Sequence, residues 1–270
     1  MNINELPIVS VIIPCFNHGK YIDEAIDSVF NQEYSNTEII VIDDCSTDEA
    51  TRTKLKNYNR PGVKVICLET NSGPSVARNI GIAQSKGKYI LPLDGDDMLG
   101  ENFLSEAVAI LENSGSVSVV YGNGQQFGSS NDFLDVPKFD QFNFVTYNVL
   151  FVTAVIRKAS ILGVGGYDEY LSKLGLEDWD LWIGFGEKKF EFRKIEIVLL
   201  KIRILDSSRT FQVANKNLDT LIAYIRQKHA NFIIETLLKY KMDYTNVLKS
   251  REYTLGNKLL KPLRWLMGKV

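Results

Sequence analysis

The sequence predicts an α/β fold in which helices cover both faces of a mostly parallel central sheet. Short β-branched and aliphatic runs alternate with longer segments in which apolar residues recur at three- and four-residue steps. Strands and helices that alternate at this spacing form right-handed βαβ units, which build parallel sheets. The chain has 270 residues, of which 45% are hydrophobic, and can therefore enclose the core of one large domain.

The first half of the chain carries the clearest alternation. Residues 8–13 form an apolar, β-branched run closed by Pro14, which is typical of a buried strand. The segment 21–32 then has one apolar helical face. The strands expected after it are 38–42, 63–68 and 89–93, and the helices are 47–57, 74–85 and 101–112.

The second half is less regular. A strand is expected at 116–121, but the pattern fails across 122–143, which is rich in Gly, Asn, Asp and Phe. This length without a pattern is typical of a functional loop, so we interpret it as a mobile substrate loop. Beyond it we expect a strand at 152–156, a helix at 179–187, an extended run at 195–204 and a helical pattern from Val213 onward.

The charge is distributed unevenly along the chain. Residues 216–270 hold 11 Lys and Arg against 4 Asp and Glu, a net charge of +7, which leaves −9 for residues 1–215. An acidic main body argues against nucleic acid as a partner, because binding it needs a basic footprint. In the tail at 256–270, basic residues interleave with Leu, Trp and Met. This pattern fits contact with an anionic membrane surface, or a helix packed on the body.

We expect a cytoplasmic protein, with a possible peripheral position at the inner face of the membrane. Its three cysteines lack the spacing of a disulfide framework or a zinc site, which fits a reducing compartment. The sequence has neither the pattern of a signal peptide nor an apolar run that approaches the ~20 residues needed to span a bilayer.

Polar residues follow three of the predicted strands. They form the segments 14–17, 43–46 and 94–97. In open α/β sheets, ligands bind beyond the carboxyl ends of the strands. The sequence therefore predicts a binding site where these segments converge.

The acidic segment Asp94-Gly95-Asp96-Asp97 gives the sharpest chemical signal. If it is extended, Asp94 and Asp96 project to the same side. Two close carboxylates need a counter-ion, and Mg²⁺ or Mn²⁺ completed by phosphate oxygens and water would supply it. The alternative is a solvated turn, since Asp and Gly are also turn residues.

Asp43 and Asp44 are candidates for binding a base N–H and a ribose hydroxyl. A purely structural interpretation explains their neighbours, because Ser46 or Thr47 would cap the next helix while acids complement its dipole. It does not explain two adjacent acids at a strand end, so we favour binding for Asp44. Arg78 is a candidate for offsetting the charge of a diphosphate, although a helical Arg is more often exposed.

Glu177 and Asp178 stand beside Trp179 and Trp182. The two tryptophans share a helical face, where structural packing is their ordinary role, and acids at a helix start complement its dipole. A carboxylate against aromatic bulk also acquires the raised pKa that suits a general base.

These motifs, in this order, resemble those of glycosyltransferase family 2. The resemblance covers roughly residues 7–205, and several ordered motifs are more specific than any one alone. It is carried by Val9-Ser10-Val11-Ile12-Ile13-Pro14, Phe16-Asn17, Val41-Ile42-Asp43-Asp44-Cys45-Ser46-Thr47-Asp48, Arg78-Asn79-Ile80-Gly81, Leu93-Asp94-Gly95-Asp96-Asp97, Gly166-Tyr167-Asp168-Glu169 and Glu177-Asp178-Trp179-Asp180-Leu181-Trp182.

The resemblance implies a GT-A type fold, a nucleotide-diphosphate sugar as donor, usually a UDP-sugar, and Mn²⁺ or Mg²⁺ as cofactor. We expect a GT-A domain at 1–210, with a donor half at 1–121 and an acceptor half at 122–210. A helical, basic C-terminal extension would follow at 211–270. The acceptor would be a saccharide or a lipid-linked hydroxyl compound, as in the synthesis of cell-surface polysaccharides.

The resemblance also assigns roles. Asp178 would deprotonate the acceptor hydroxyl, with Glu177 as the second candidate, and direct displacement would invert the anomeric carbon. Pro14, Phe16 and Asp44 would line the nucleoside, Arg78 would lie near the base or diphosphate, and Asp94 and Asp96 would hold ribose and metal. The expected donor-binding residues are Pro14, Phe16, Asn17, Asp43, Asp44, Arg78, Asp94 and Asp96, and the expected metal ligands are Asp96 and Asp97.

One departure and three competing functions qualify this assignment. Where many relatives carry a His or Arg after the last core strand, this sequence offers only Arg209. A sugar nucleotidyltransferase or a Rossmann dehydrogenase would show a Gly-rich loop after the first strand, which residues 17–20 do not form. A non-catalytic nucleotide-sugar-binding protein would be expected to lack the metal acids or the late Glu-Asp pair.

Overall fold

The computed structural model describes residues 6–204, 209–250 and 253. For residues 209–217 it describes the backbone alone. The chain divides into two compact units, Met1–Ile225 and Arg226–Val270. The first unit holds the sheet, its covering helices and every candidate site residue named above, and of these only the side chain of Arg209 lies outside the described residues.

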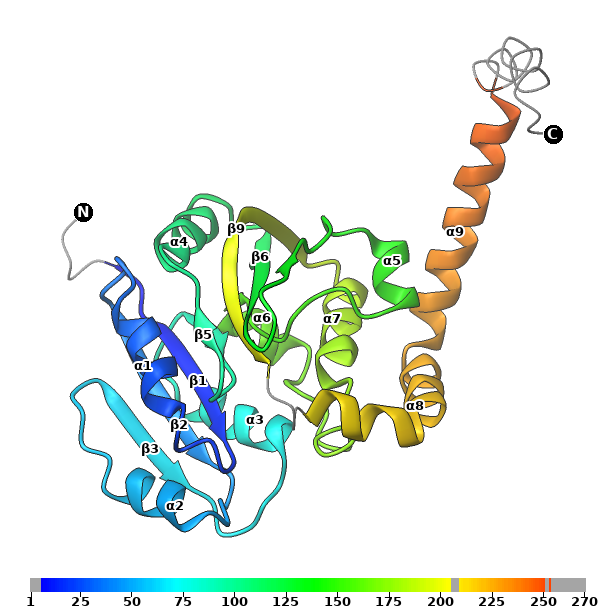
Figure 1. Cartoon of the computed structure of the whole chain (residues 1–270). Helices are drawn as coiled ribbons and strands as arrows, with labels where there is room; N and C mark the ends of the chain where they lie inside the picture. The colour runs from blue at the N-terminus through cyan, green and yellow to red at the C-terminus, as the bar shows by residue number, and fades with distance from the viewer. Residues whose placement is uncertain (1–5, 205–208, 251–252, 254–270) are drawn as a thin grey trace. The chain divides into compact units, whose positions relative to one another are not determined.

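A nine-stranded sheet forms the centre of the first unit (Figure 1). Along the sheet the order is β3-β2-β1-β4-β8-β6-β9-β5, with β7 paired to β6. Strands β3, β2, β1 and β4 run parallel, as do β6 and β9, whereas β8 is antiparallel to both of its neighbours. The strands are β1 (Val9–Cys15), β2 (Thr37–Asp43), β3 (Val63–Cys67), β4 (Tyr89–Pro92), β5 (Met98–Leu99), β6 (Val117–Gly128), β7 (Phe133–Leu134), β8 (Val155–Arg157) and β9 (Glu191–Ile204).

Helices cover both faces of this sheet, as the sequence predicts. In β1, Val11 and Ile13 pack in the hydrophobic cluster that includes α1 and α4, while Ile12 packs in the cluster that includes α3 and α7. Gly81 lets α3 lie against β1, because an added Cβ would collide with the side chain of Ile12. The helices of this unit are α1 (Ile22–Phe30), α2 (Glu49–Lys56), α3 (Pro74–Gln84), α4 (Phe103–Asn113), α5 (Gln141–Thr146), α6 (Lys158–Gly163) and α7 (Glu177–Glu187).

The predicted mobile loop at 122–143 is wrong over its first part. Strand β6 continues to Gly128, paired with β9 as far as Gly128 opposite Ile204. Its glycines mark close approaches, since a Cβ on Gly124 would meet the ring of Phe151. The partner strand lies far along the chain, so the local pattern could not show the pairing.

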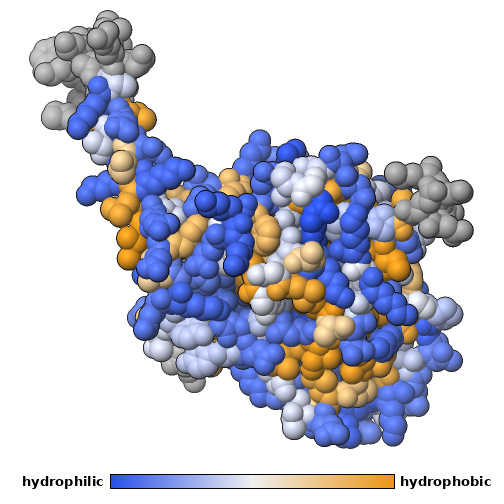
Figure 2. All heavy atoms as spheres, turned by 180° about the vertical axis from the view of Figure 1, so that it is seen from behind, coloured by the Kyte–Doolittle hydropathy of each residue, from blue (hydrophilic) through white to orange (hydrophobic). Residues whose placement is uncertain are grey.

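The C-terminal part of the chain is helical, as predicted. Helix α8 spans Arg209–Lys228 and α9 spans Ala230–Lys249. Hydrophobic and hydrophilic residues both reach the surface of α9, among them Ile234, Leu238 and Met242, which are more than half exposed (Figure 2). The tail at 256–270 lies outside the described residues. No described helix combines the length and the apolar character needed to cross a bilayer.

Candidate active site

The loop after β1 is fastened to the loop after β2 by Asn17. Its Oδ1 accepts the backbone N–H groups of Thr47 at 2.8 Å and of Asp48 at 2.9 Å. Asn17 itself has a left-handed φ of 60°, which asparagine tolerates better than most residues. Pro14 is buried in β1, whereas Phe16 is 39% exposed. The predicted donor residue Asn17 therefore has a structural role in this loop.

The two acids at the end of β2 are buried and bind backbone amides. Oδ1 of Asp43 accepts the N–H of Ser46 at 3.0 Å. The carboxylate of Asp44 accepts the N–H groups of Ser72 and Gly73, each at 2.7 Å, and so holds the loop that leads into α3. Their exposed fractions are only 5% and 4%, and through these hydrogen bonds both acids support the local backbone. Their contact with a sugar donor stays a prediction.

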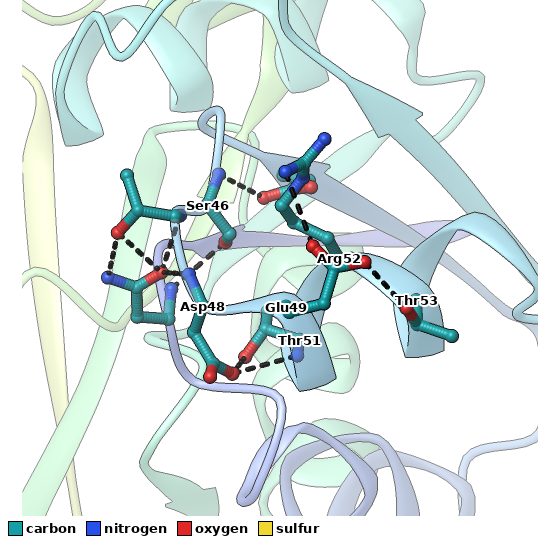
Figure 3. Close-up of polar contacts among 9 residues, drawn as sticks. Ser46, Asp48, Glu49, Thr51, Arg52 and Thr53 are labelled. Atoms are coloured by element: carbon teal, nitrogen blue, oxygen red, sulfur yellow. Dashed lines mark hydrogen bonds and ion pairs between the residues drawn. The ribbon is translucent and has the colours of Figure 1, made fainter.

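Helix α2 is capped by Asp48, not by Ser46 or Thr47 as the sequence suggested (Figure 3). The carboxylate of Asp48 accepts the N–H of Thr51 at 2.8 Å and its hydroxyl at 2.6 Å. These hydrogen bonds lower the pKa of Asp48. The hydroxyl oxygens of Ser46 and Thr47 instead accept N–H groups of Asn17, one from its backbone and one from its side-chain amide.

The acidic segment after β4 is a turn, so the prediction of an extended backbone is wrong. The N–H of Asp97 donates to the carbonyl of Asp94 at 3.1 Å and closes the turn. The carboxylates still influence one another. Burial, followed by the charges of Asp94 and Asp96, raises the pKa of Asp97 to about 8. Burial likewise raises the pKa of Asp96, against the opposing effect of His18, whose Nδ1 lies 3.5 Å from its Oδ1.

Arg203, near the end of β9, holds this turn and was missed in the sequence. Its Nε donates to the carbonyl of Asp96 and its backbone N–H to Oδ1 of Asp97, both at 2.9 Å. Its guanidinium also pairs with Glu24 and lies over the rings of Tyr21 and Phe127. An arginine inside a predicted strand gives no local signal of such a role, and the family pattern points instead to Arg209, just beyond the strand.

Arg78 joins the acidic segment after β4 to the acidic start of α7. Its Nη2 donates to Asp94 at 2.7 Å and its Nη1 to Glu177 at 2.8 Å, with a side chain only 3% exposed. Although burial opposes its charge, the carboxylates of Asp94 and Glu177 raise its pKa, so Arg78 stays protonated. Arg78 is thus a buried bridge between α3, the turn after β4 and α7, so the alternative of an exposed helical Arg is wrong, and its contact with a diphosphate stays a prediction.

Asn79 anchors the adjacent motif at Tyr167. Its Oδ1 accepts the N–H of Tyr167 and its Nδ2 donates to the carbonyl of the same residue, both at 2.9 Å. The ring of Tyr167 is buried near Arg78, with the guanidinium 5.3 Å from its centroid. Two motifs that are about ninety residues apart in the sequence therefore meet beside the bridge.

Asp178 lies next to this bridge at the start of α7. Its Oδ2 accepts a hydrogen bond from Nδ2 of Asn148 at 2.8 Å, and its Oδ1 accepts the N–H of Trp179 at 2.8 Å. Burial, followed by the charge of Glu177, raises the pKa of Asp178 to about 6. A carboxylate in this range is suited to accept a proton near neutral pH. The indole of Trp179 donates to the carbonyl of Phe144 and packs α7 against α5.

The turn after β4 fits a divalent cation that takes most of its ligands from a substrate. Asp94, Asp96 and Asp97 gather carboxylates whose mutual repulsion a cation would relieve. Among the residues that the structure describes, no group of three His, Cys, Asp or Glu side chains forms a metal cage. Mg²⁺ and Mn²⁺ bind through one or two carboxylates when phosphate and water complete the shell. Asp96 is the better placed ligand, because Asp97 already accepts a backbone N–H.

Comparison with known proteins shows what this chain resembles. The model of the family described as "Glycosyl transferase family 2" matches residues 10–158. The chain is 40% identical to poly(ribitol-phosphate) beta-N-acetylglucosaminyltransferase TarS of Staphylococcus aureus over 106 residues. These residues make up 38% of this chain and 18% of TarS. Over 96 residues the chain is 43% identical to the putative teichuronic acid biosynthesis glycosyltransferase TuaG of Bacillus subtilis, covering 35% of the chain and 38% of TuaG.

The fold is also shared with a solved structure. The crystal structure of S. aureus TarS 1-349 in complex with UDP-GlcNAc superposes with a TM-score of 0.67 and 22% sequence identity, covering 91% of this chain and 77% of the other. This similarity establishes the GT-A type α/β architecture that the resemblance implied.

Proposed function

The chain belongs to glycosyltransferase family 2, and we propose that it transfers a sugar from a nucleotide-diphosphate sugar to a hydroxyl group with inversion of the anomeric carbon. The observation that carries this proposal is the Arg78 bridge. It brings Asp94, beside the proposed metal ligand, next to Glu177 and hence to Asp178. A donor-side charge site and an acceptor-side base are thereby held at one place, as a single displacement requires.

The proposed donor is a UDP-sugar, and the proposed acceptor is a hydroxyl of a cell-surface polymer or its lipid-linked precursor. Support comes from the relatives, since one is named for adding N-acetylglucosamine to poly(ribitol-phosphate) and another for teichuronic acid biosynthesis. The chain spans well under two thirds of both proteins, so their substrates serve as a guide to the first donors and acceptors to test.

In the proposed reaction, Asp178 accepts the proton of the attacking hydroxyl. The acceptor oxygen forms a bond to the anomeric carbon while the bond from that carbon to the diphosphate oxygen breaks. The bonding electrons leave with the nucleoside diphosphate. A Mn²⁺ or Mg²⁺ ion held through Asp96, with Asp97 as second candidate, would neutralise the charge that develops there. Arg78 would keep Asp94 and Glu177 in place without itself reacting.

A donor and product screen tests the proposal directly. Purified protein is incubated with UDP-, GDP- and dTDP-sugars, Mn²⁺ and ribitol-phosphate or saccharide acceptors, and the products are analysed by mass spectrometry and NMR. We expect one nucleotide class to give a product with an inverted anomeric configuration. A retained configuration would overturn the mechanism, and donor binding without any transfer or hydrolysis would favour the non-catalytic alternative.

Metal dependence has a separate test. Removing a carboxylate leaves the diphosphate charge less well neutralised, so Asp96→Asn should cut turnover severely while the thermal unfolding midpoint stays near that of the wild type. Excess EDTA should abolish wild-type turnover, and added Mn²⁺ should restore it. Undiminished turnover in EDTA would show that no divalent cation takes part.

Peripheral membrane contact is proposed for the C-terminal part of the chain. Its support is the net charge of +7 over residues 216–270 and the exposed apolar side chains of α9. At low salt the full chain should sediment with vesicles containing phosphatidylglycerol, and deletion of 256–270 should release it. Vesicles of phosphatidylcholine alone are the control, and a full chain that ignores anionic vesicles would exclude this contact.

A further inference from the structure

Asn148 makes a side-chain contact with Asp178 from a different element of the fold. It lies just after α5, whose residues Phe144 and Val145 are buried. Its Nδ2 donates to Oδ2 of Asp178 at 2.8 Å. Its own Oδ1 accepts the N–H of Leu150 at 3.4 Å, which orients the amide so that the NH₂ group faces the carboxylate. This asparagine matches no motif of the family resemblance.

The support for Asn148 is itself anchored to α7. The indole N–H of Trp179 donates to the carbonyl of Phe144 at 2.7 Å, so the residue after Asp178 fixes helix α5, which ends two residues before Asn148. Leu150, which donates its N–H to Asn148, is only 4% exposed. Helices α5 and α7 are therefore joined by a hydrogen bond, and buried residues on both sides of Asn148 restrict the position of its amide.

The other groups around Asp178 do not replace this contact. Glu177 on the same helix carries a like charge, and Arg78 on α3 already binds Asp94 and Glu177. The interaction of the buried Tyr167 with Asp178 is electrostatic and comes from the charge of the Asp178 carboxylate. The remaining hydrogen bond comes from the backbone N–H of Trp179, on the other carboxylate oxygen. A second hydrogen bond from Asn148 stops the carboxyl group from rotating freely about its bond to Cβ.

We propose that Asn148 is a positioning residue that fixes the rotation of the Asp178 carboxylate and favours its ionised, proton-accepting form. This inference rests on the proposed role of Asp178 as the base. A hydrogen bond donated to a carboxylate stabilises its charged form. Loss of Asn148 should therefore reduce transfer in two separable ways, through orientation at high pH and through protonation at low pH.

The test is the pH profile of transfer in Asn148→Ala and Asn148→Asp. In the wild type, transfer should fall below pH about 6, where Asp178 becomes protonated. In Asn148→Ala the acidic limb should move up by roughly half a unit to one unit, because the donor that lowers the pKa of Asp178 is gone. The plateau rate should fall about tenfold while the KM for the donor stays unchanged.

Asn148→Asp keeps the size of the side chain but places a second negative charge beside Asp178, so its limb should move further up than that of Asn148→Ala. Asn143→Ala, in the preceding helix α5, is the control and should leave the limb in place. An active wild type and an inactive Asp178→Asn, combined with unshifted limbs in both Asn148 variants, would overturn the inference alone. A wild type without transfer, or an active Asp178→Asn, would instead overturn the proposed function.

Discussion

The proposed donor side and the proposed acceptor side of the site are held in place by different kinds of contact. At the ends of β1 and β2, Asn17, Asp43 and Asp44 bind backbone N–H groups of nearby loops. On the proposed acceptor side, Asp178 is held partly by the side chain of Asn148, from another helix-flanking segment. Removal of the Asp43 or Asp44 carboxylate should therefore affect stability first, and removal of the Asp178 carboxylate should affect transfer first.

The largest expected effect is the loss of transfer in Asp178→Asn. The substitution preserves size and one of the two accepted hydrogen bonds but removes basicity, and a positioned base contributes roughly 10²–10⁴-fold. Transfer should fall at least about a hundredfold, while donor affinity measured by calorimetry stays at the wild-type value. Near-normal transfer would remove Asp178 from the mechanism, and lost donor affinity would break the division between the two sides.

The stability of the wild type relative to this variant should depend on pH. Folding raises the pKa of Asp178 from 3.8 to about 6, so the folded state disfavours its charge. The proton is then bound more tightly in the folded protein, and this contribution to stability is present at low pH and lost as the pH rises through about 6. The difference between the unfolding midpoints of wild type and variant should therefore be constant below pH about 4 and should shift in favour of the variant as the pH rises to about 6.

Glu177→Gln should have a smaller effect on transfer, with a clear cost in stability. Its carboxylate pairs with Arg78, whose side chain is 3% exposed, and hydrogen bonds to charged groups contribute roughly 1.5–3 kcal/mol. We expect chemical denaturation to show a loss of that order in the free energy of unfolding. Transfer should decrease about tenfold, because Arg78 loses its ion pair with Glu177 and no longer links Asp94 to α7 in the same way. Loss as complete as in Asp178→Asn would make Glu177 the base.

The sequence predicted the donor half closely because its signals are local. The run at 8–13 and the helical periodicity that follows it each fall within one element, and the polar strand ends follow from the general rule for parallel sheets. The strands β1 to β4 and the helices α1 to α4 all lie where this alternation placed them, with ends shifted by a few residues.

The contacts between distant parts of the chain could not be predicted in the same way. The pairing of β6 with β9, the bridge from Arg78 to Glu177 and the contact of Asn148 with Asp178 each join residues 30 or more positions apart. A composition rich in Gly and Asn indicated a loop at 122–143, although the glycines serve close packing in a strand. The role of Arg203 in holding the turn after β4 could not be predicted, because only its tertiary neighbours distinguish it from any other arginine in a strand.

Asp44→Asn should lower stability with a modest effect on catalysis. Both carboxylate oxygens of Asp44 accept N–H groups, and the NH₂ group of an asparagine would face one of these donors. A buried donor left without an acceptor costs roughly 1–3 kcal/mol. Urea denaturation should show this loss, and the KM for the donor should rise while kcat is kept. An unchanged midpoint would contradict the structural role, and an unchanged KM would contradict the predicted contact with the nucleoside.

The smallest expected effect comes from Asp48, which lies in the same loop but serves only the start of α2. Its carboxylate caps the helix by accepting the N–H and the hydroxyl of Thr51 (Figure 3). Replacing an N-cap aspartate by alanine destabilises the helix, whereas asparagine caps about as well. Asp48→Ala should lower the free energy of unfolding by less than Asp44→Asn does, Asp48→Asn should keep it, and neither should change donor KM or transfer. If Asp48→Ala impaired transfer as much as Asp44→Asn, the loop would act as one unit, and donor binding could not be assigned to Asp44 separately from its neighbours.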